Sequence, residues 1–281
     1  MIDPAGILGY VFPEQAQEYS PRDAILYALG LGLGRDPLDV DDLRFLDERQ
    51  LSVMPTFAVT LCSPGMWIRD PALGVDFTRL VHLAHDAEFL GPLSPAARMS
   101  GTAKVIALGD RGPGRGAELV LERTIAEGNT IRCRLRQTLL LRGDGGYGGP
   151  APERLVLPQP ETEPDARIEI ATSPRAALIY RLSGDWNPLH LDPAVAQAAS
   201  FPRPILQGLA SYGIAGVAVS RALSRAPEQV TRLACRFAGV VLPGDRIEFL
   251  AWRKGARSAQ FVGMVDGREV LADGQISWEQ V

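Results

Sequence analysis

A carboxylate, a carboxamide and an imidazole lie within six residues of one another in the segment YRLSGDWNPLH, residues 180–190. They belong to Asp185, Asn187 and His190, and a carboxylate close to an imidazole is a common pair for general acid and base catalysis. A glycine and a proline within the segment bend the backbone, so the three polar side chains can converge. We therefore interpret the segment as a site of proton transfer, although an isolated Asp or His is more often a helix cap or a structural histidine.

The composition indicates a folded protein that is large enough for two domains. The chain has 281 residues, of which 46% are hydrophobic and 22% are charged, and its formal net charge is -4. This length accommodates two domains of about 140 residues each. The slight negative charge provides no general attraction to nucleic acid or to an anionic membrane surface. We therefore expect neither nucleic acid nor a membrane as a partner.

Cysteine content and the N-terminal residues bear on the compartment. The three cysteines are widely spaced and include no Cys-Xaa-Xaa-Cys pair, which disfavours a disulfide scaffold and a zinc site, so we expect no metal. The N-terminus lacks the basic region and apolar core of a signal peptide, and no apolar run is long enough to span a membrane. We expect a cytoplasmic protein.

Two pairs of similar segments indicate an internal duplication. SPRDAILYAL at residues 20–29 matches SPRAALIYRL at residues 173–182, which is an offset of 153 (173 minus 20). FLGPLSPAAR at residues 89–98 matches FAGVVLPGDR at residues 237–246, which is an offset of 148 (237 minus 89). Two matches at nearly the same offset favour two copies of one domain over chance.

The duplication predicts which half carries the chemistry. The sequence predicts an N-terminal domain, a linker rich in proline and acidic residues, and a C-terminal domain, at residues 1–150, 151–167 and 168–281. An offset of 153 carries Asp185 and His190 onto Gly32 and Pro37, neither of which can exchange protons. We therefore expect the C-terminal domain to be catalytic and the N-terminal domain to be a structural partner that helps to bind substrate.

Each half is predicted to contain helices followed by several strands. In the second half, residues 205–223 (ILQGLASYGIAGVAVSRAL) are nearly all apolar or small, which predicts a buried helix. Four short β-prone segments follow it, RLACRFAG, RIEFLAWR, AQFVGMVDG and EVLADGQISW, separated by turn residues. A buried helix followed by an antiparallel sheet predicts an α+β fold in which the sheet wraps the helix.

The segment at residues 180–190 closely resembles the signature of the hydratase 2, or MaoC-like, (R)-specific enoyl-CoA hydratases. FPRPILQGLASYGIAG, from Phe201, and LRGDGGYGG, from Leu141, resemble two further blocks of that family, so the resemblance covers almost the whole chain. It implies a double hot dog fold, α+β in class, with two tandem repeats that each wrap an antiparallel sheet around a long central helix. The N-terminal repeat then contributes to the acyl and CoA pocket, and the C-terminal repeat is catalytic.

The resemblance also implies a reaction, the reversible syn addition of water to a trans-2-enoyl-CoA to give an (R)-3-hydroxyacyl-CoA. No metal or redox cofactor is implied, because CoA is part of the substrate. Asp185 and His190 match the family's catalytic pair, and Asn187 matches an amide that positions this pair or the thioester. Gly208 matches the glycine whose amide binds the thioester oxygen, and it lies near the start of the predicted buried helix, where amides lack helical partners.

Other residues match positions that hold the CoA ester in the family. His82, Leu83 and Phe237 match residues around the thioester, and Arg111 matches a basic residue in a turn. Arg111 and Arg203 both suit the phosphate groups of CoA, since guanidinium groups bind phosphate through paired hydrogen bonds. We therefore expect an acyl-CoA thioester as the ligand, and a homodimer as the assembly.

Two departures from the family leave the acyl group open. The chain reads His82-Leu-Ala-His85 where relatives commonly read His-Gly-Glu-Gln, and Gln207 stands where most have a histidine. An alternative is therefore a dehydratase for a specialised acyl-CoA, such as a branched, dicarboxylic or steroid side-chain ester, or for an acyl carrier protein substrate. A non-catalytic acyl-CoA-binding subunit is a further alternative, and a hot dog thioesterase is less favoured. The two histidines could also be structural residues on one face of a strand.

Overall fold

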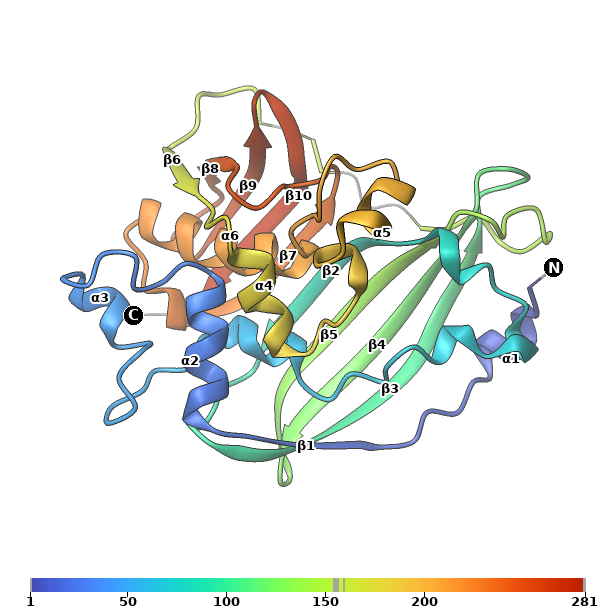
Figure 1. Ribbon diagram of the computed structural model, residues 1–281, viewed down its shortest axis with the longest axis horizontal. Coiled ribbons are helices and arrows are strands. Elements are labelled where there is room, and N and C mark those ends of the chain that lie inside the picture. Colours follow the sequence, from blue (N-terminus) through green and yellow to red (C-terminus); the bar gives the residue numbers. More distant parts are fainter. Residues whose placement is uncertain (1, 154–156, 159, 280–281) are drawn as a thin grey trace.

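The computed structural model describes residues 2–153, 157–158 and 160–279. Its strands form one antiparallel sheet in the order β1-β3-β4-β5-β2-β7-β10-β9-β8-β6 (Figure 1). The strands of the first half are β1 (Gln15–Tyr19), β2 (Leu80–Phe89), β3 (Ala97–Asp110), β4 (Ala117–Glu127) and β5 (Thr130–Leu141). The strands of the second half are β6 (Ala166–Ala171), β7 (Val230–Phe237), β8 (Arg246–Arg253), β9 (Ser258–Val265) and β10 (Arg268–Trp278). The last four lie on the four β-prone segments expected from the sequence.

Each strand of the first half can be matched with the strand whose number is five higher. The strand order is then the same when read from either edge of the sheet. β1 then corresponds to β6 at the two edges, and β2 corresponds to β7 at the centre. β2 and β7 pair with each other through residues 84–88 and 232–236, which joins the two halves into one sheet. This symmetry is the arrangement that an internal duplication predicts.

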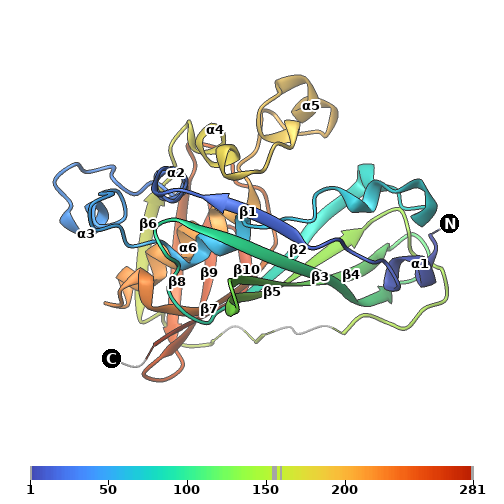
Figure 2. The ribbon, with the colours of Figure 1, turned by 90° about the horizontal axis from the view of Figure 1, so that it is seen from below.

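The domain boundaries at 150 and 168 stay a prediction. Residues 154–156 and 159 of the predicted linker lie outside the described residues, and β6 begins at Ala166, inside the last two residues of that linker. The neighbouring described segments run along the outer face of the sheet (Figure 2). There the Asp110 amide donates to the Pro150 carbonyl, and the Trp252 indole donates to the Thr162 carbonyl.

Most helices are short, and local sequence signals fix several of their starts. Ser20 and Asp23 form a capping box at the start of α2, and Asp192 caps α5 by accepting a hydrogen bond from the Ala194 amide. The α-helices are α1 (Pro4–Leu8), α2 (Pro21–Gly30), α3 (Val40–Leu43), α4 (Ala176–Tyr180), α5 (Pro193–Ala198) and α6 (Gly208–Ala222). The 3₁₀ helices are η1 (Pro55–Thr60), η2 (Trp67–Arg69), η3 (Pro71–Leu73), η4 (Phe77–Arg79), η5 (Arg181–Ser183), η6 (Pro188–His190) and η7 (Pro227–Gln229).

The duplicated segments that contain α2 and α4 pack against each other. Tyr27 and Tyr180 are equivalent residues, 153 positions apart (180 minus 27), and their ring centroids are 5.7 Å apart in the core. A Cβ atom at Gly30 would lie 3.3 Å from the Cα atom of Tyr180, so the two helices approach closely at this point. The two copies therefore meet through equivalent residues.

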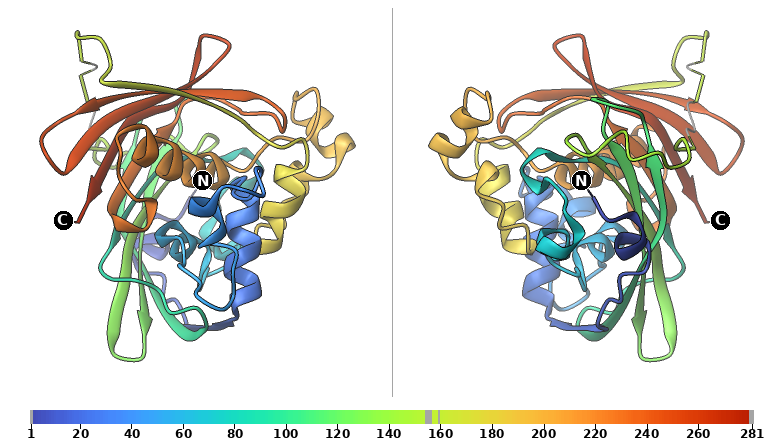
Figure 3. Two further views of the ribbon diagram at one scale, coloured as in Figure 1. Left: turned by 90° about the vertical axis from the view of Figure 1, so that its left-hand side faces the viewer. Right: turned by 90° about the vertical axis from the view of Figure 1, so that its right-hand side faces the viewer.

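The central helix is long only in the second half. α6 lies inside the curve of the sheet (Figure 3), and its residues from Ala210 to Ser220 are all buried. Gly216 lets it approach β7, because a Cβ atom there would lie 3.3 Å from the Leu233 side chain. In the first half, the expected long helix is replaced by the six residues of η1. The expectation of one long central helix in each repeat is therefore correct for the second repeat and wrong for the first.

The apolar core has two parts. The larger cluster surrounds α6 and draws on both halves of the chain. The smaller cluster lies at the far end of the first-half sheet, where Leu119 and Leu141 pack against Ile7, Ile68 and Leu73. Among the described residues, no helix has the length and apolar character needed to cross a membrane.

Candidate active site

The segment at residues 180–190 forms a loop that leads from α4 to α5. Gly184 follows η5 with a φ of 111°, a left-handed conformation that favours glycine over other residues. η6 then brings His190 back toward Asp185, and the His190 Nε2 atom lies 3.6 Å from the Asp185 Oδ2 atom. The His190 side chain is 9% exposed and the Asp185 side chain is 42% exposed. The loop thus places a buried imidazole against a carboxylate that solvent can reach.

One hydrogen bond fixes the orientation of His190. Its Nδ1 atom lies 2.8 Å from the Ile205 carbonyl oxygen, which can only accept a hydrogen bond. Nδ1 therefore carries the proton, and Nε2 presents a lone pair toward Asp185 in the neutral imidazole. The separation of 3.6 Å between Nε2 and Oδ2 is longer than a direct hydrogen bond, which suits two groups that hold the same water molecule.

Asn187 shapes the loop through its side-chain oxygen. Its Oδ1 atom accepts a hydrogen bond of 3.0 Å from the Leu189 amide and so caps η6. The backbone N–H of Asn187 in turn donates a hydrogen bond of 3.2 Å to the Asp185 Oδ1 atom. Asn187 is thereby tied to the segment that carries both Asp185 and His190. A direct contact between its side-chain NH2 group and the thioester stays a prediction.

Gly208 is the first residue of α6, where the backbone amides have no carbonyl in a preceding turn to bind. The Phe237 ring lies directly against it, because a Cβ atom at Gly208 would be 3.1 Å from the Phe237 Cε1 atom. A larger residue would therefore have to displace that ring. Ile205, which orients His190, precedes Gly208 by three residues, so the imidazole is tied to the segment that starts α6.

Gln207 connects the start of α6 to α4. It is buried, and its Nε2 atom donates a hydrogen bond of 3.1 Å to the Ala177 carbonyl. Gln207 is therefore a buried link between two elements of the site.

A β-bulge brings two histidines of β2 to the same face. The register with β5 shifts between His82 and Ala84, so Leu83 is an extra residue in β2. In a regular strand, residues 82 and 85 would point to opposite faces. In the structure their rings are 5.3 Å apart, and the His82 ring is 4.8 Å from the Phe237 ring. The predicted ester-binding residues His82 and Phe237 therefore lie together beside Gly208.

Burial keeps both histidines neutral. Loss of water around His82 lowers its pKa to about 4, and burial lowers the pKa of His85 well below its usual range. The His85 Nδ1 atom lies 3.4 Å from the His82 Nε2 atom, which itself lies 3.1 Å from the Ala84 carbonyl oxygen. Because a carbonyl only accepts, the proton of His82 belongs on Nε2, and its Nδ1 atom is a hydrogen-bond acceptor.

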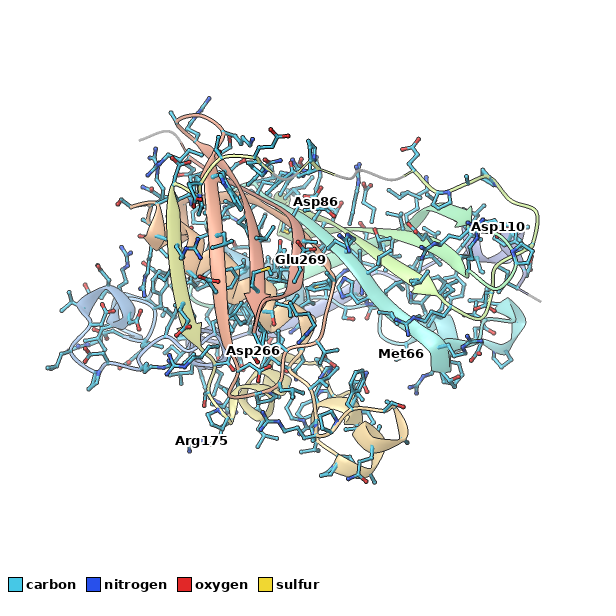
Figure 4. All side chains as sticks on the ribbon, turned by 90° about the horizontal axis from the view of Figure 1, so that it is seen from above. Met66, Asp86, Asp110, Arg175, Asp266 and Glu269 are labelled. Carbon is cyan, nitrogen blue, oxygen red and sulfur yellow. The ribbon has the colours of Figure 1, made fainter. Side chains whose placement is uncertain are left out.

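The two predicted phosphate-binding arginines already have carboxylate partners. Arg111 lies 3.4 Å from Glu118, and Arg203 lies 3.8 Å from Asp245. Glu118 alternates along β4 with two residues of the smaller core cluster, so it faces the outer side of the sheet. Asp110, next to Arg111, lies near one end of the long axis, and Arg175 at the start of α4 lies in the other half of the molecule (Figure 4). A phosphate contact by either arginine stays a prediction.

Comparisons with known proteins show the family of the chain. Residues 17–143 match the family model described as "MFE-2 hydratase 2 N-terminal domain", and residues 156–272 match the one described as "MaoC like domain". The chain is 37% identical to 3-hydroxyacyl-thioester dehydratase Y of Mycobacterium tuberculosis, over 99% of this chain and 98% of the relative. The chain belongs to the MaoC-like hydratase 2 family.

Other members extend the comparison. The peroxisomal enoyl-CoA hydratase 2 of Arabidopsis thaliana is 35% identical over 89% of this chain and 87% of its own length. The crystal structure of a MaoC-like dehydratase from Phytophthora capsici superposes with a TM-score of 0.87 at 27% identity, covering 99% of this chain and 98% of the other. The double hot dog fold expected from the sequence is therefore confirmed, and family membership supports a hydro-lyase.

Some contacts of this MaoC-like site have no counterpart in the sequence pattern. Ile205 acts through its backbone carbonyl, so its residue type carries no signal of that role. The bulge at Leu83 could not be predicted either, because nothing in the local residues of β2 indicates where the register shifts. Among the described residues, no three His, Cys, Asp or Glu side chains gather in a way that could hold a metal ion.

Proposed function

We propose that this protein is an (R)-specific enoyl-CoA hydratase that also runs in reverse as a 3-hydroxyacyl-CoA dehydratase. The observation that carries the proposal is the pairing of Asp185 with an imidazole whose Nδ1 proton is held by the Ile205 carbonyl, next to the start of α6. Hydratase and dehydratase names among its relatives support the same reaction class.

In this proposal, one water molecule sits between the Asp185 carboxylate and the Nε2 atom of His190. One of the two groups takes a proton from the water as its oxygen bonds to C3 of the enoyl group, and a proton is delivered to C2 from the same face. Both partners reach the substrate from one side, which gives syn addition. The separation of 3.6 Å between Nε2 and Oδ2 fits a shared water.

Electrons pushed toward the thioester during the addition create negative charge on its carbonyl oxygen. The amide of Gly208, at the start of α6, would donate to that oxygen, with the helix dipole adding to the effect. A donor of this kind stabilises the transition state by about 3 kcal/mol. The Phe237 ring lies against this glycine and the His82 ring lies against Phe237, so both would hold the thioester in place.

A direct test is the hydration of crotonyl-CoA and of longer trans-2-enoyl-CoAs, followed by chiral analysis of the product. We expect turnover with the (R)-3-hydroxyacyl-CoA as the product, and no release of free CoA. Absence of hydration on every chain length, branched and bulky acyl groups included, would refute the proposal. CoA release would point instead to a thioesterase.

A dehydratase for a specialised acyl group is a second candidate. The altered segment from His82 to His85 favours it, because this segment lies beside the predicted thioester site. Acyl carrier protein substrates belong to the same candidate, and rates on matched CoA and carrier thioesters separate the two carriers. A homodimer is expected for either candidate, and sedimentation of the purified protein tests it.

A further inference from the structure

The concave face of the first-half sheet carries polar side chains where a simple acyl pocket would be apolar. In the second half α6 fills the corresponding space, so we expect an acyl chain that extends from Gly208 to run along the first half. Residues of β2, β4 and β5 form this face between the two apolar clusters. Its polar members are His82, His85, Arg123 and Gln137.

Gln137 marks the border between the two clusters. Its neighbours on the same face of β5, Leu135 and Leu139, are 1% and 6% exposed and belong to different clusters. Gln137 itself is half-buried, so this face is open where it lies. His85 is paired with Gln137 across β2 and β5, so the two side chains lie about 5 Å apart on the same face.

Arg123 is a buried cation without a carboxylate partner among the residues that the structure describes. It is 4% exposed, and it donates hydrogen bonds of 2.9 and 2.8 Å to the Leu61 and Val59 carbonyls. Its Nε atom has no hydrogen-bond partner, and neither has the Nε2 atom of the buried His85. Buried polar atoms are rarely left in this state, because they lose hydrogen bonds to water and gain none in the protein.

The charge of Arg123 persists at neutral pH and acts on its neighbours. Burial lowers its pKa only to about 10, so the guanidinium stays protonated. The same charge contributes to the lowered pKa of both His82 and His85, which places all three groups in one electrostatic environment. This environment is positive, and no acidic side chain of the described residues neutralises it.

The polar groups connect to the predicted thioester site through a line of contacts. The Phe237 ring lies against Gly208, the His82 ring is 4.8 Å from Phe237, and the His85 Nδ1 atom is 3.4 Å from the His82 Nε2 atom. His85 also packs against Tyr212, one turn along α6 from Gly208. An acyl chain that starts at Gly208 and follows α6 would therefore approach the polar cluster.

We propose that His85, Arg123 and Gln137 form a subsite for a carboxylate carried on the acyl chain of the substrate. The inference rests on the proposed hydratase function and names its substrate class. A carboxylate would neutralise Arg123 and accept hydrogen bonds from the nitrogen atoms that have no partner, whereas a plain alkyl chain would leave them unmet.

The test compares medium-chain trans-2-enoyl-CoAs with and without a terminal carboxylate. We expect the wild-type kcat/KM to be at least about tenfold higher for the carboxylated probe, as for one charge-assisted contact. Gln137→Leu and Arg123→Lys should each remove most of this preference. Crotonyl-CoA is too short to reach the subsite, so its hydration should change by less than about twofold. Thr138→Val, on the same strand but the opposite face, is the matched control.

Two outcomes overturn the inference. One is a wild-type enzyme that hydrates the plain probe as well as the carboxylated one, and the other is an unchanged preference in both variants. Binding of the saturated CoA esters, measured by calorimetry, gives a readout that does not depend on turnover. If the enzyme hydrates crotonyl-CoA but shows no preference for the carboxylated probe, only this inference is refuted. If it hydrates no substrate but binds the carboxylated ester more tightly, only the proposed reaction is refuted. Gln137→Leu covers the case in which Arg123→Lys fails to fold.

Discussion

In the second half, the concave face of the sheet is filled by the buried helix α6, whereas in the first half only the six residues of η1 lie at the corresponding place. The strands of the two halves nevertheless correspond one to one. The proposed catalytic positions also differ between the halves, since Asp185 and His190 correspond to Gly32 and Pro37. Both copies thus share one arrangement of strands, and under the proposed function they carry out different tasks.

Under the proposed function, each half contributes something that the other half lacks. The central helix supplies free amides at its start, which suit a thioester oxygen, but it also occupies the space that an acyl chain needs. The first half has only the six residues of η1 at the corresponding place, and so offers no such helix start there. Pairing the two through β2 and β7 places the bulge at Leu83 next to Phe237, where the two environments meet.

The largest expected effect is a loss of turnover at the proposed catalytic positions of the second half, with no loss at the equivalent position tested in the first half. Asp185→Asn and His190→Ala should each lower kcat for crotonyl-CoA hydration by about a thousandfold, because either change removes a proton-transfer group. Pro37→Ala, at the exposed position equivalent to His190, should leave kcat unchanged. Near-normal turnover in either catalytic variant would remove that residue from the mechanism.

The next effect concerns the start of α6, which the first half lacks. Gly208→Ala should lower kcat by about a hundredfold, because the new Cβ atom meets the Phe237 ring at 3.1 Å and crowds the place of the thioester oxygen. Gly216→Ala is the matched control on the same helix, with a contact of 3.3 Å to Leu233 far from the start. Equal losses in both variants would mean that general helix packing, and not the oxyanion position, is responsible.

A third prediction addresses the joint between the halves. Asp42 is buried, accepts a hydrogen bond of 2.7 Å from the Gly34 amide and pairs with Arg221 of α6 at 2.6 Å. Asp42→Asn should lower the free energy of unfolding by about 2 kcal/mol, because it leaves a partly buried arginine unpaired. Urea unfolding measures this, and Arg167→Gln, in an exposed pair, should cost less than about 1 kcal/mol. Similar losses in both would contradict a special role for the joint.

The smallest effect tests the polar face of the first half. The pKa of His82 is lowered from 6.5 to about 4 in the folded protein, so the unfolded chain binds more protons between these values. Stability should therefore be complete above pH 6.5 and fall as the pH drops toward 4. His82→Gln should flatten this dependence by about 1 to 2 kcal/mol in unfolding experiments at several pH values. Parallel pH profiles for the two proteins would show that His82 is not buried in its neutral form.

The sequence by itself determined the elements whose signals are local. The loop with Asp185 and His190 and the four strands of the second half follow from residue types and spacing, because turns and β-prone runs act over a few residues. The repeat at residues 20–29 and 173–182 likewise anticipated the symmetric strand order.

Only the tertiary structure decided how the halves differ inside. The long helix expected in the first half is absent, because what fills a concave face depends on packing between residues far apart in the chain. The shift of register at Leu83, the Ile205 carbonyl on His190 and the carboxylate partner of Arg203 have the same origin. Each is a contact between segments that are separated in the chain, and the local residue pattern does not show which separated segment will pack against it.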